Sequence, residues 1–281
     1  MIIDAIADSL IDSIKLLPFL FLTYLAMEYL EHKAGRKMQE AIQRAGRGGP
    51  VIGSILGAFP QCGFSTAASN LYAGRIITVG TLLAIFLSTS DEMLPIMISE
   101  NVEAAVILKI LAVKVIIGMT AGFLFDFILN DRKKEMQIEH LCEQHHCHCE
   151  EGIWKSALHH TLEIFLYIMI ISLALNLFIA WIGEDVLADL VLNRPMLGEL
   201  AAALVGMIPN CASSVAITQL YLDGVLSAGA LTAGLLSGSG VGLLVLFRVN
   251  DDQRENFKIL VLLYVAGVAG GLLVNCLGIV F

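Results

Sequence analysis

The chain has 281 residues, of which 57% are hydrophobic and only 15% are charged. Soluble domains contain roughly 45–50% apolar and about 25% charged residues, so the composition excludes an ordinary soluble domain and indicates an integral membrane protein. The formal net charge of −9 argues against nucleic acid as a partner and leaves the lipid bilayer as the first expected one.

The N-terminus, MIIDAIADSLIDS, is acidic and lacks the basic stretch that opens a secretory signal. We therefore expect the first hydrophobic segment, residues 13–30, to remain in the mature protein. Bilayer spans need about 18–20 apolar residues. Further apolar segments of about this length are predicted at 76–98, 105–129, 158–182, 225–247 and 258–280. Trp154 and Trp181 flank one of these segments, a placement typical of interfacial anchors.

Two weaker segments, 50–74 and 198–222, contain small and polar residues near their middles. They carry the related sequences FPQCGFSTAASNLY and IPNCASSVAITQLY. Proline removes a backbone donor, so each segment is predicted to be a broken helix.

Basic residues cluster at 32–47 and in the sequence DRKK at 131–134. The positive-inside rule places both stretches in the cytoplasm. This holds only if 50–74 and 198–222 each enter and leave the membrane on the same face, as re-entrant hairpins. We therefore expect two hairpins that enter from opposite faces, both termini outside, and the central linker in the cytoplasm.

A shift of 149 residues aligns the two halves of the chain without a gap from 57 to 96. The Pro-x-Cys, Leu-Tyr and Ser-x-Ser sequences all recur at this one offset. The sequence thus predicts an all-α membrane protein with two inverted-topology repeats, as in secondary transporters. The expected units are a first repeat at 1–130, a linker at 131–154 and a second repeat at 155–281.

Broken helices of such repeats meet near the bilayer midplane and line the substrate site. Amide oxygens, hydroxyls and carboxylates suit hard cations, whereas cysteine thiolates suit softer metals. The acidic pair Asp91 and Glu92 has no counterpart in the second half. A carboxylate at membrane depth indicates a functional site. Two plainer interpretations stay open: the cysteines as small buried hydrophobes, and the acids as solvated groups at an external mouth. The candidate substrate-binding residues are Pro60, Gln61, Cys62, Ser65, Thr66, Asp91, Glu92, Pro209, Asn210, Cys211, Ser213 and Ser214.

The linker contains the sequence EHLCEQHHCHCEE at 139–151. Imidazole and thiolate groups are the usual ligands of zinc, copper, nickel and cobalt. The spacing is not that of a zinc finger, so we expect a loop that captures or senses a transition-metal ion, with no tightly bound cofactor elsewhere. A solvated linker with incidental ligands is the alternative. The candidate ligands are His140, Cys142, His145, His146, Cys147, His148 and Cys149.

The sequence shows no phosphate-binding GxxxxGK[ST] and no nucleophile elbow, so we expect no enzyme. Three functions stay open. The first is a secondary-active exporter of a metal ion; the second is a permease for an arsenic species or another oxyanion. The third is a metal-responsive membrane sensor with 139–151 as its receptor. Homo-oligomerisation is left open.

The paired Pro-x-Cys sequences, the STSDE sequence at 88–92 and the His/Cys-rich linker resemble the ten-transmembrane heavy-metal exporters. Members of that family are labelled arsenic efflux proteins or manganese transporters. The resemblance extends over nearly the whole chain. It implies metal efflux across a prokaryotic plasma membrane, and about ten membrane helices if each hairpin arm is counted.

Overall fold

The computed structural model describes residues 48–58, 62–90, 93–129, 197–209 and 211–281, with single positions between 14 and 25 and between 154 and 173. These residues form helices and no strand, which agrees with the predicted all-α fold. Only scattered positions of the predicted segments 13–30 and 158–182 are among the described residues. The first half contains α3 (Gly49–Gly57), α4 (Cys62–Ala73), α5 (Val79–Ser88), α6 (Met93–Ser99) and α7 (Ala104–Leu129). The second half contains α11 (Leu197–Gly206), α12 (Cys211–Leu222), α13 (Ala228–Ser237), α14 (Gly242–Val249) and α15 (Gln253–Cys276).

Within the described ranges, three stretches are long and apolar enough to cross a membrane: Ala104–Leu129, Ala228–Val249 and Gln253–Cys276. The side of α7 that faces away from the bundle exposes large apolar side chains, including Leu108, Ile116 and Phe127. Such a surface is stable against lipid rather than water. The chain is therefore a multi-pass membrane protein.

The predicted apolar segments 76–98 and 225–247 are each interrupted, which the sequence analysis did not anticipate. Helix α5 ends at Ser88 and α6 begins at Met93; α13 ends at Ser237 and α14 begins at Gly242. The capping residue after each first piece, Thr89 or Gly238, leaves the helical conformation at ψ 128° or 102°. We call the described residues after α5, Thr89 and Ser90, the α5/α6 break, and residues 238–241 the α13/α14 break.

The helices of the two halves recur at the 149-residue spacing found in the sequence. Shifting α4 and α5 by that number gives the bounds of α12 and α13. The local details recur as well. Thr78 caps α5 by accepting from the Thr81 amide, and Ser227 caps α13 by accepting from the Ala230 amide. A left-handed backbone follows α4 at Arg75 (φ 56°) and α12 at Gly224 (φ 76°).

Small residues let the helices of each half approach closely. A Cβ atom at Gly80 would lie 2.1 Å from the Gly122 carbonyl oxygen, and one at Gly229 would lie 2.8 Å from the Gly271 carbonyl oxygen. These glycines bring α5 against α7 and α13 against α15. Close backbone packing of this kind is the main stabilising contact between helices in a bilayer.

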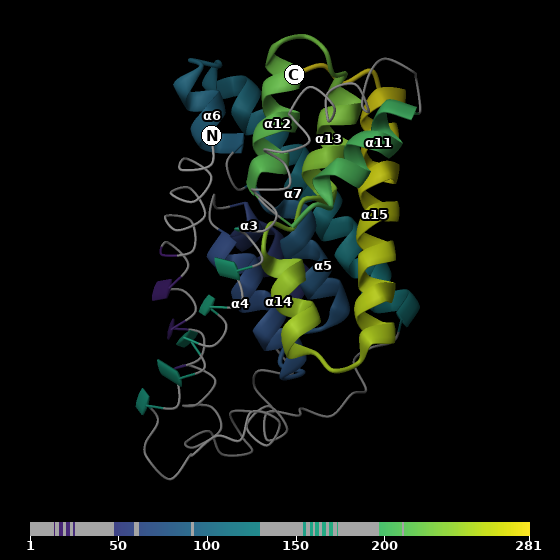
Figure 1. The fold of residues 1–281 in the computed structure, drawn as a ribbon. Helices are drawn as coiled ribbons and strands as arrows, with labels where there is room; N and C mark the ends of the chain where they lie inside the picture. Colours follow the sequence, from purple (N-terminus) through teal and green to yellow (C-terminus); the bar gives the residue numbers. More distant parts are fainter. Residues whose placement is uncertain are drawn as a thin grey trace.

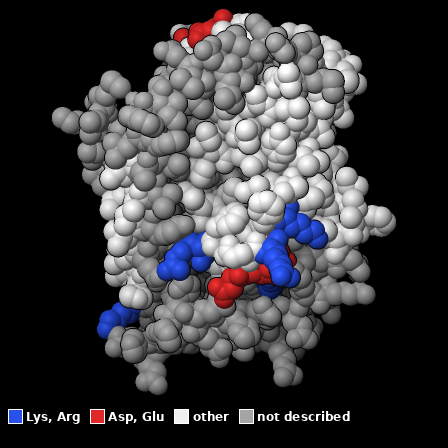
Figure 2. Space-filling view, turned by 45° about the vertical axis from the view of Figure 1, so that its right-hand side comes forward, with Lys and Arg blue, Asp and Glu red and all other residues white. Residues whose placement is uncertain are grey.

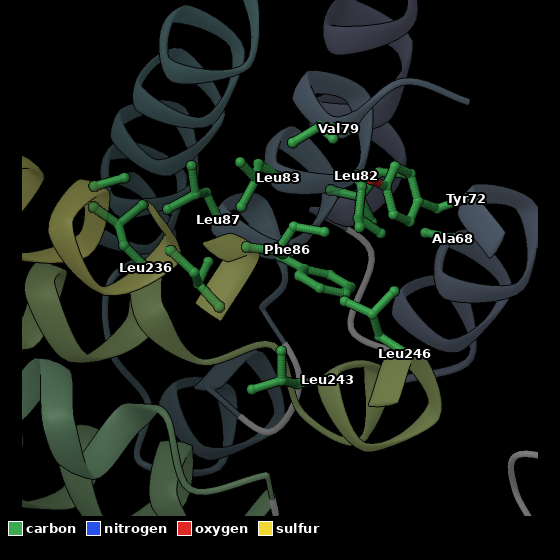
Figure 3. Packing of buried hydrophobic residues seen from close by; sticks show 14 residues of the cluster. Ala68, Tyr72, Val79, Leu82, Leu83, Phe86, Leu87, Leu236, Leu243 and Leu246 are labelled. Atoms are coloured by element: carbon green, nitrogen blue, oxygen red, sulfur yellow. The ribbon is translucent and has the colours of Figure 1, made fainter. Parts of the chain in front are cut away.

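Helices of one half also pack against helices of the other half. Helix α4 packs mainly against α14, and α12 packs against α6. In Figure 1, α4 and α14 lie together in the lower part and α6 and α12 in the upper part. One buried cluster joins α4 and α5 to the second half through Leu236, Leu243 and Leu246, as Figure 3 shows around Phe86. The broken helices are thus held inside a shared core.

Candidate functional site

The beginning of α14 meets the first turns of α4 deep in the bundle. Ser69 Oγ lies 2.6 Å from the Gly242 carbonyl oxygen and 3.0 Å from that of Ser65. A Cβ at Gly242 would lie 2.7 Å from Ser65 Cβ. Only glycine therefore fits at this crossing, and the start of α14, just after the α13/α14 break, packs directly on α4.

Hydroxyl groups line the interior around the breaks and the hairpin arms. Both Ser65 and Thr66 are completely buried, and Ser213 and Ser214 on α12 are buried almost as deeply. Ser213 Oγ donates to the Ile208 carbonyl (3.2 Å) across the turn between α11 and α12. These four predicted residues therefore belong to a polar interior inside an apolar bundle. The other buried hydroxyls near them are Ser69, Ser88, Thr89, Ser90, Thr218, Ser237 and Ser239.

Two of these hydroxyls occupy equivalent positions at the ends of α5 and α13 but differ in their bonding. Ser237 Oγ donates to the Ala203 carbonyl (2.8 Å) and so ties α13 to α11. Ser88 Oγ is buried and has no hydrogen-bond partner. A buried polar atom without a partner is costly and commonly marks a place where a ligand or ion binds.

Lys114 extends into the α5/α6 break from the middle of α7. Its side chain is fully buried, and Nζ donates to the carbonyl oxygen of Thr89, the C-cap of α5. The carbonyls at a helix C-terminus carry partial negative charge. The end of α5 therefore already holds a positive group, and the sequence alone shows Lys114 only as a lone charge in an apolar segment.

Several predicted residues cannot be placed. Side chains of Cys62 and Cys211 are not described, although their backbones begin α4 and α12; Pro209 lies in the turn that precedes α12. The two hairpin arms were expected to face one another, and the described residues show no extensive contact between α4 and α12. Outside the described residues lie Pro60, Gln61, Asp91, Glu92 and Asn210, and with them the linker ligands His140, Cys142, His145, His146, Cys147, His148 and Cys149. Among the described residues, no cluster of three or more His, Cys, Asp or Glu could hold a metal.

Buried carboxylates that the sequence analysis did not include in the site lie at the outer ends of α5 and α13. Asp126 accepts from the Gly80 amide and from Thr78 Oγ1, both at 2.8 Å. At the equivalent place Asn275 donates to Glu199 Oε1 (2.9 Å). In the first half a buried carboxyl group on α7 therefore holds the start of α5, and in the second half a buried carboxyl group on α11 binds α15. The exchange of Asp126 for Asn275 at the 149-residue offset was a usable signal.

Among the described residues, the charged side chains at the surface gather toward the two ends of the molecule. On the face shown in Figure 2, charged side chains gather near the lower end, with a small acidic group at the top, and the described surface between them is uncharged. Residues 248–258, which run from the end of α14 into the first turns of α15, carry three basic and three acidic residues. The connection between the two helices lies at the lower end of both in Figure 1. An uncharged belt between charged ends fits a bilayer.

Half-helices that end inside an apolar, hydroxyl-lined bundle are typical of membrane transport proteins. The chain belongs to the family described as "Putative, 10TM heavy-metal exporter", whose model matches residues 1–186. The match confirms the family resemblance and spans the first half, the linker and the beginning of the second half. No curated protein and no solved structure gives a significant match to this chain.

Proposed function

We propose that this protein is a secondary-active exporter of a divalent metal ion, with manganese as the leading candidate. Its family supports metal efflux in general. The observation that carries the finer proposal is the environment at the end of α5, where the Thr89 carbonyl accepts an ammonium hydrogen and Ser88 Oγ is left without a partner. Oxygen donors that attract positive charge suit hard cations such as Mn²⁺.

The proposed site is the interior between the two hairpins and the α5/α6 break. Its oxygen donors are the hydroxyls of Ser65, Thr66, Ser213 and Ser214, the amides of Gln61 and Asn210, and the carboxylates of Asp91 and Glu92. The acidic pair follows Thr89 directly in sequence and supplies the negative charge that a divalent ion requires. Cys62 and Cys211, with Pro60 and Pro209, shape the hairpin tips and become ligands if the cargo is a softer metal.

The two halves act as inverted repeats in this proposal, and each hairpin enters the membrane from its own face. The exchange of partners between α4–α14 and α12–α6 supports this, because it relates the halves by an approximate two-fold operation. The basic linker would then lie in the cytoplasm of a prokaryotic cell. There its His and Cys side chains, kept reduced, would collect the metal before export.

A second candidate is a permease for an oxyanion such as an arsenic species. It is favoured by the positive charge of Lys114 in the interior and by the half-helix N-termini of α4, α12 and α14, which attract anions. This candidate requires no carboxylate in the site. It therefore predicts that neutral substitutes for Asp91 and Glu92 leave transport intact.

Metal-resolved efflux from cells tests the proposal. Cells that express the wild type, Asp91→Asn/Glu92→Gln or Cys62→Ser/Cys211→Ser are loaded with manganese, zinc, cobalt or arsenite, and their metal content is followed. We expect manganese efflux by the wild type, its loss in the carboxylate variant and its retention in the cysteine variant. Loss only in the cysteine variant would indicate a soft cargo, and no efflux by the wild type would refute export.

A further inference from the structure

The C-terminal end of α5 is contacted by a basic side chain of the protein itself, that of Lys114. Lys114 is completely buried on a membrane-spanning helix, and its ammonium group donates to the Thr89 carbonyl. A charged group at membrane depth is costly and persists only where the surroundings compensate it. The compensation here includes the negative end of the half-helix, since Thr89 is the cap of α5.

The two halves differ in charge at this place. The residue equivalent to Lys114 is Leu263, and the residues equivalent to Asp91 and Glu92 are Gly240 and Val241. In sequence, the amino group of Lys114 and the acidic pair therefore occur together in one half and are absent together from the other.

The hydroxyl groups of Ser88 and Ser237, at the two breaks, also differ between the halves. Ser237 uses its hydroxyl to bind the Ala203 carbonyl of the hairpin. Ser88, its equivalent, is fully buried, and its hydroxyl has no hydrogen-bond partner. An oxygen donor is therefore available beside the ammonium group in the half that carries the acids, and it is engaged in the half that lacks them. The α5/α6 break is the place where a second cation can be received.

We propose that Lys114 is a tethered counter-cation that competes with the metal ion for the α5/α6 break. This inference rests on the proposed function and adds a specificity-determining residue to it. Without metal, the ammonium group balances the negative end of α5 and the acidic pair. An entering divalent ion repels the ammonium group, so part of the binding free energy is spent on displacing it. Lys114 thereby keeps the metal affinity low enough for release, which transport requires as much as binding.

Binding of Mn²⁺ to purified full-length protein tests this competition, with free Mn²⁺ measured from its paramagnetic resonance signal. All variants carry serine at the seven His and Cys positions of 139–151, which removes metal binding by the linker. Lys114→Gln removes the charge but retains a donor for the Thr89 carbonyl, and Lys114→Met removes both. Lys114→Arg keeps the charge. Leu263→Met is the matched control in the second half.

Removal of the charge is expected to tighten Mn²⁺ binding at least about tenfold in Lys114→Gln and Lys114→Met. It should also slow Mn²⁺ release from proteoliposomes several-fold, because no ammonium group competes with the bound ion. Lys114→Arg and Leu263→Met should stay within about threefold of the parent. Unchanged or weaker binding in Lys114→Gln would overturn the inference. A parent protein that exports Mn²⁺ while this variant binds it unchanged refutes only the competition; a parent that neither binds nor exports Mn²⁺ refutes the proposed function itself.

Discussion

Arg75 Nη2 lies 2.6 Å from Glu255 Oε2, and this ion pair joins the turn after α4 to the first turn of α15. Arg75 adopts a left-handed backbone conformation (φ 56°), which is unfavourable for a residue other than glycine. Its guanidinium group also stacks on Tyr72, 5.1 Å from the ring centroid. The ion pair and the stacking therefore hold a strained residue in place where the two halves meet.

Removal of either charge from this pair should weaken the junction between the halves. Burial lowers the pKa of Arg75, but the hydrogen bond to Glu255 and the nearby charges raise it above its ordinary value overall. Arg75 thus stays charged at every physiological pH, and its contribution to stability should be constant from about pH 6 to 9. We expect Glu255→Gln to lower the free energy of unfolding by about 1–3 kcal/mol.

A double-mutant cycle in detergent measures this pair. Arg75→Met and Glu255→Gln are compared singly and together by their unfolding free energies. Coupled residues give a double variant that is less destabilised than the sum of the two single variants. Additive effects would show that the 2.6 Å contact contributes nothing of its own.

Gly242 should not tolerate a side chain. A Cβ there would lie 2.9 Å from Phe86 Cε1 and equally close to the Ser65 carbonyl carbon, so Gly242→Ala must push α14 away from α4. Gly238, in the same break, has its nearest such atom at 3.5 Å. We expect Gly242→Ala to lose most transport and several degrees of melting temperature, and Gly238→Ala to retain both. Equal behaviour of the two variants in a transport assay would contradict the close crossing.

Ser88 and Ser237 occupy equivalent positions, but their alanine variants should differ: one should affect transport and the other stability. Ser237→Ala removes the hydrogen bond to Ala203 and should cost about 1 kcal/mol of stability. Ser88→Ala removes no hydrogen bond from the described structure and should leave the melting temperature nearly unchanged. If Ser88 Oγ contributes to the cation site, the alanine variant raises the metal concentration needed for half-maximal transport. An unchanged concentration dependence would remove Ser88 from the site.

The His and Cys residues of the linker should determine how the metal is bound in the cytoplasm rather than how it crosses the membrane. Serine at all seven His and Cys positions of 139–151 is expected to abolish zinc binding by the linker, because imidazole and thiolate are its usual ligands. Transport should then require a higher cytoplasmic metal concentration. Equilibrium dialysis gives the zinc bound per chain for both proteins. The same zinc content in both would show that the tract is only a solvated linker.

The sequence predicts most of the helices because apolar length and the 149-residue repeat are both visible in it. It does not predict the α5/α6 and α13/α14 breaks, although hydroxyl residues cluster at 88–90 and recur at 237 and 239 within long apolar runs. Small hydroxyl residues are tolerated in membrane helices, so they do not by themselves signal an interruption. The breaks become evident only from the caps and from the packing around Gly242.

Contacts between the halves were beyond the reach of the sequence. The repeat predicts that α4 and α12 are equivalent, but not that α4 packs against α14 and α12 against α6. The same limit applies to single side chains. Lys114 could be recognised as a charge in an apolar helix, yet its contact with Thr89 depends on how α7 crosses the end of α5. Tertiary packing of this kind is set by helix crossings rather than by local pattern.

The most direct test of the central claim uses the purified full-length protein in proteoliposomes loaded with Mn²⁺. Release of the ion is followed with and without a pH gradient, and empty liposomes provide the background. The account predicts Mn²⁺ flux that requires the protein and is lost in Asp91→Asn/Glu92→Gln. A chain that binds metal but carries no Mn²⁺, Zn²⁺ or Co²⁺ across the bilayer under any gradient would contradict it.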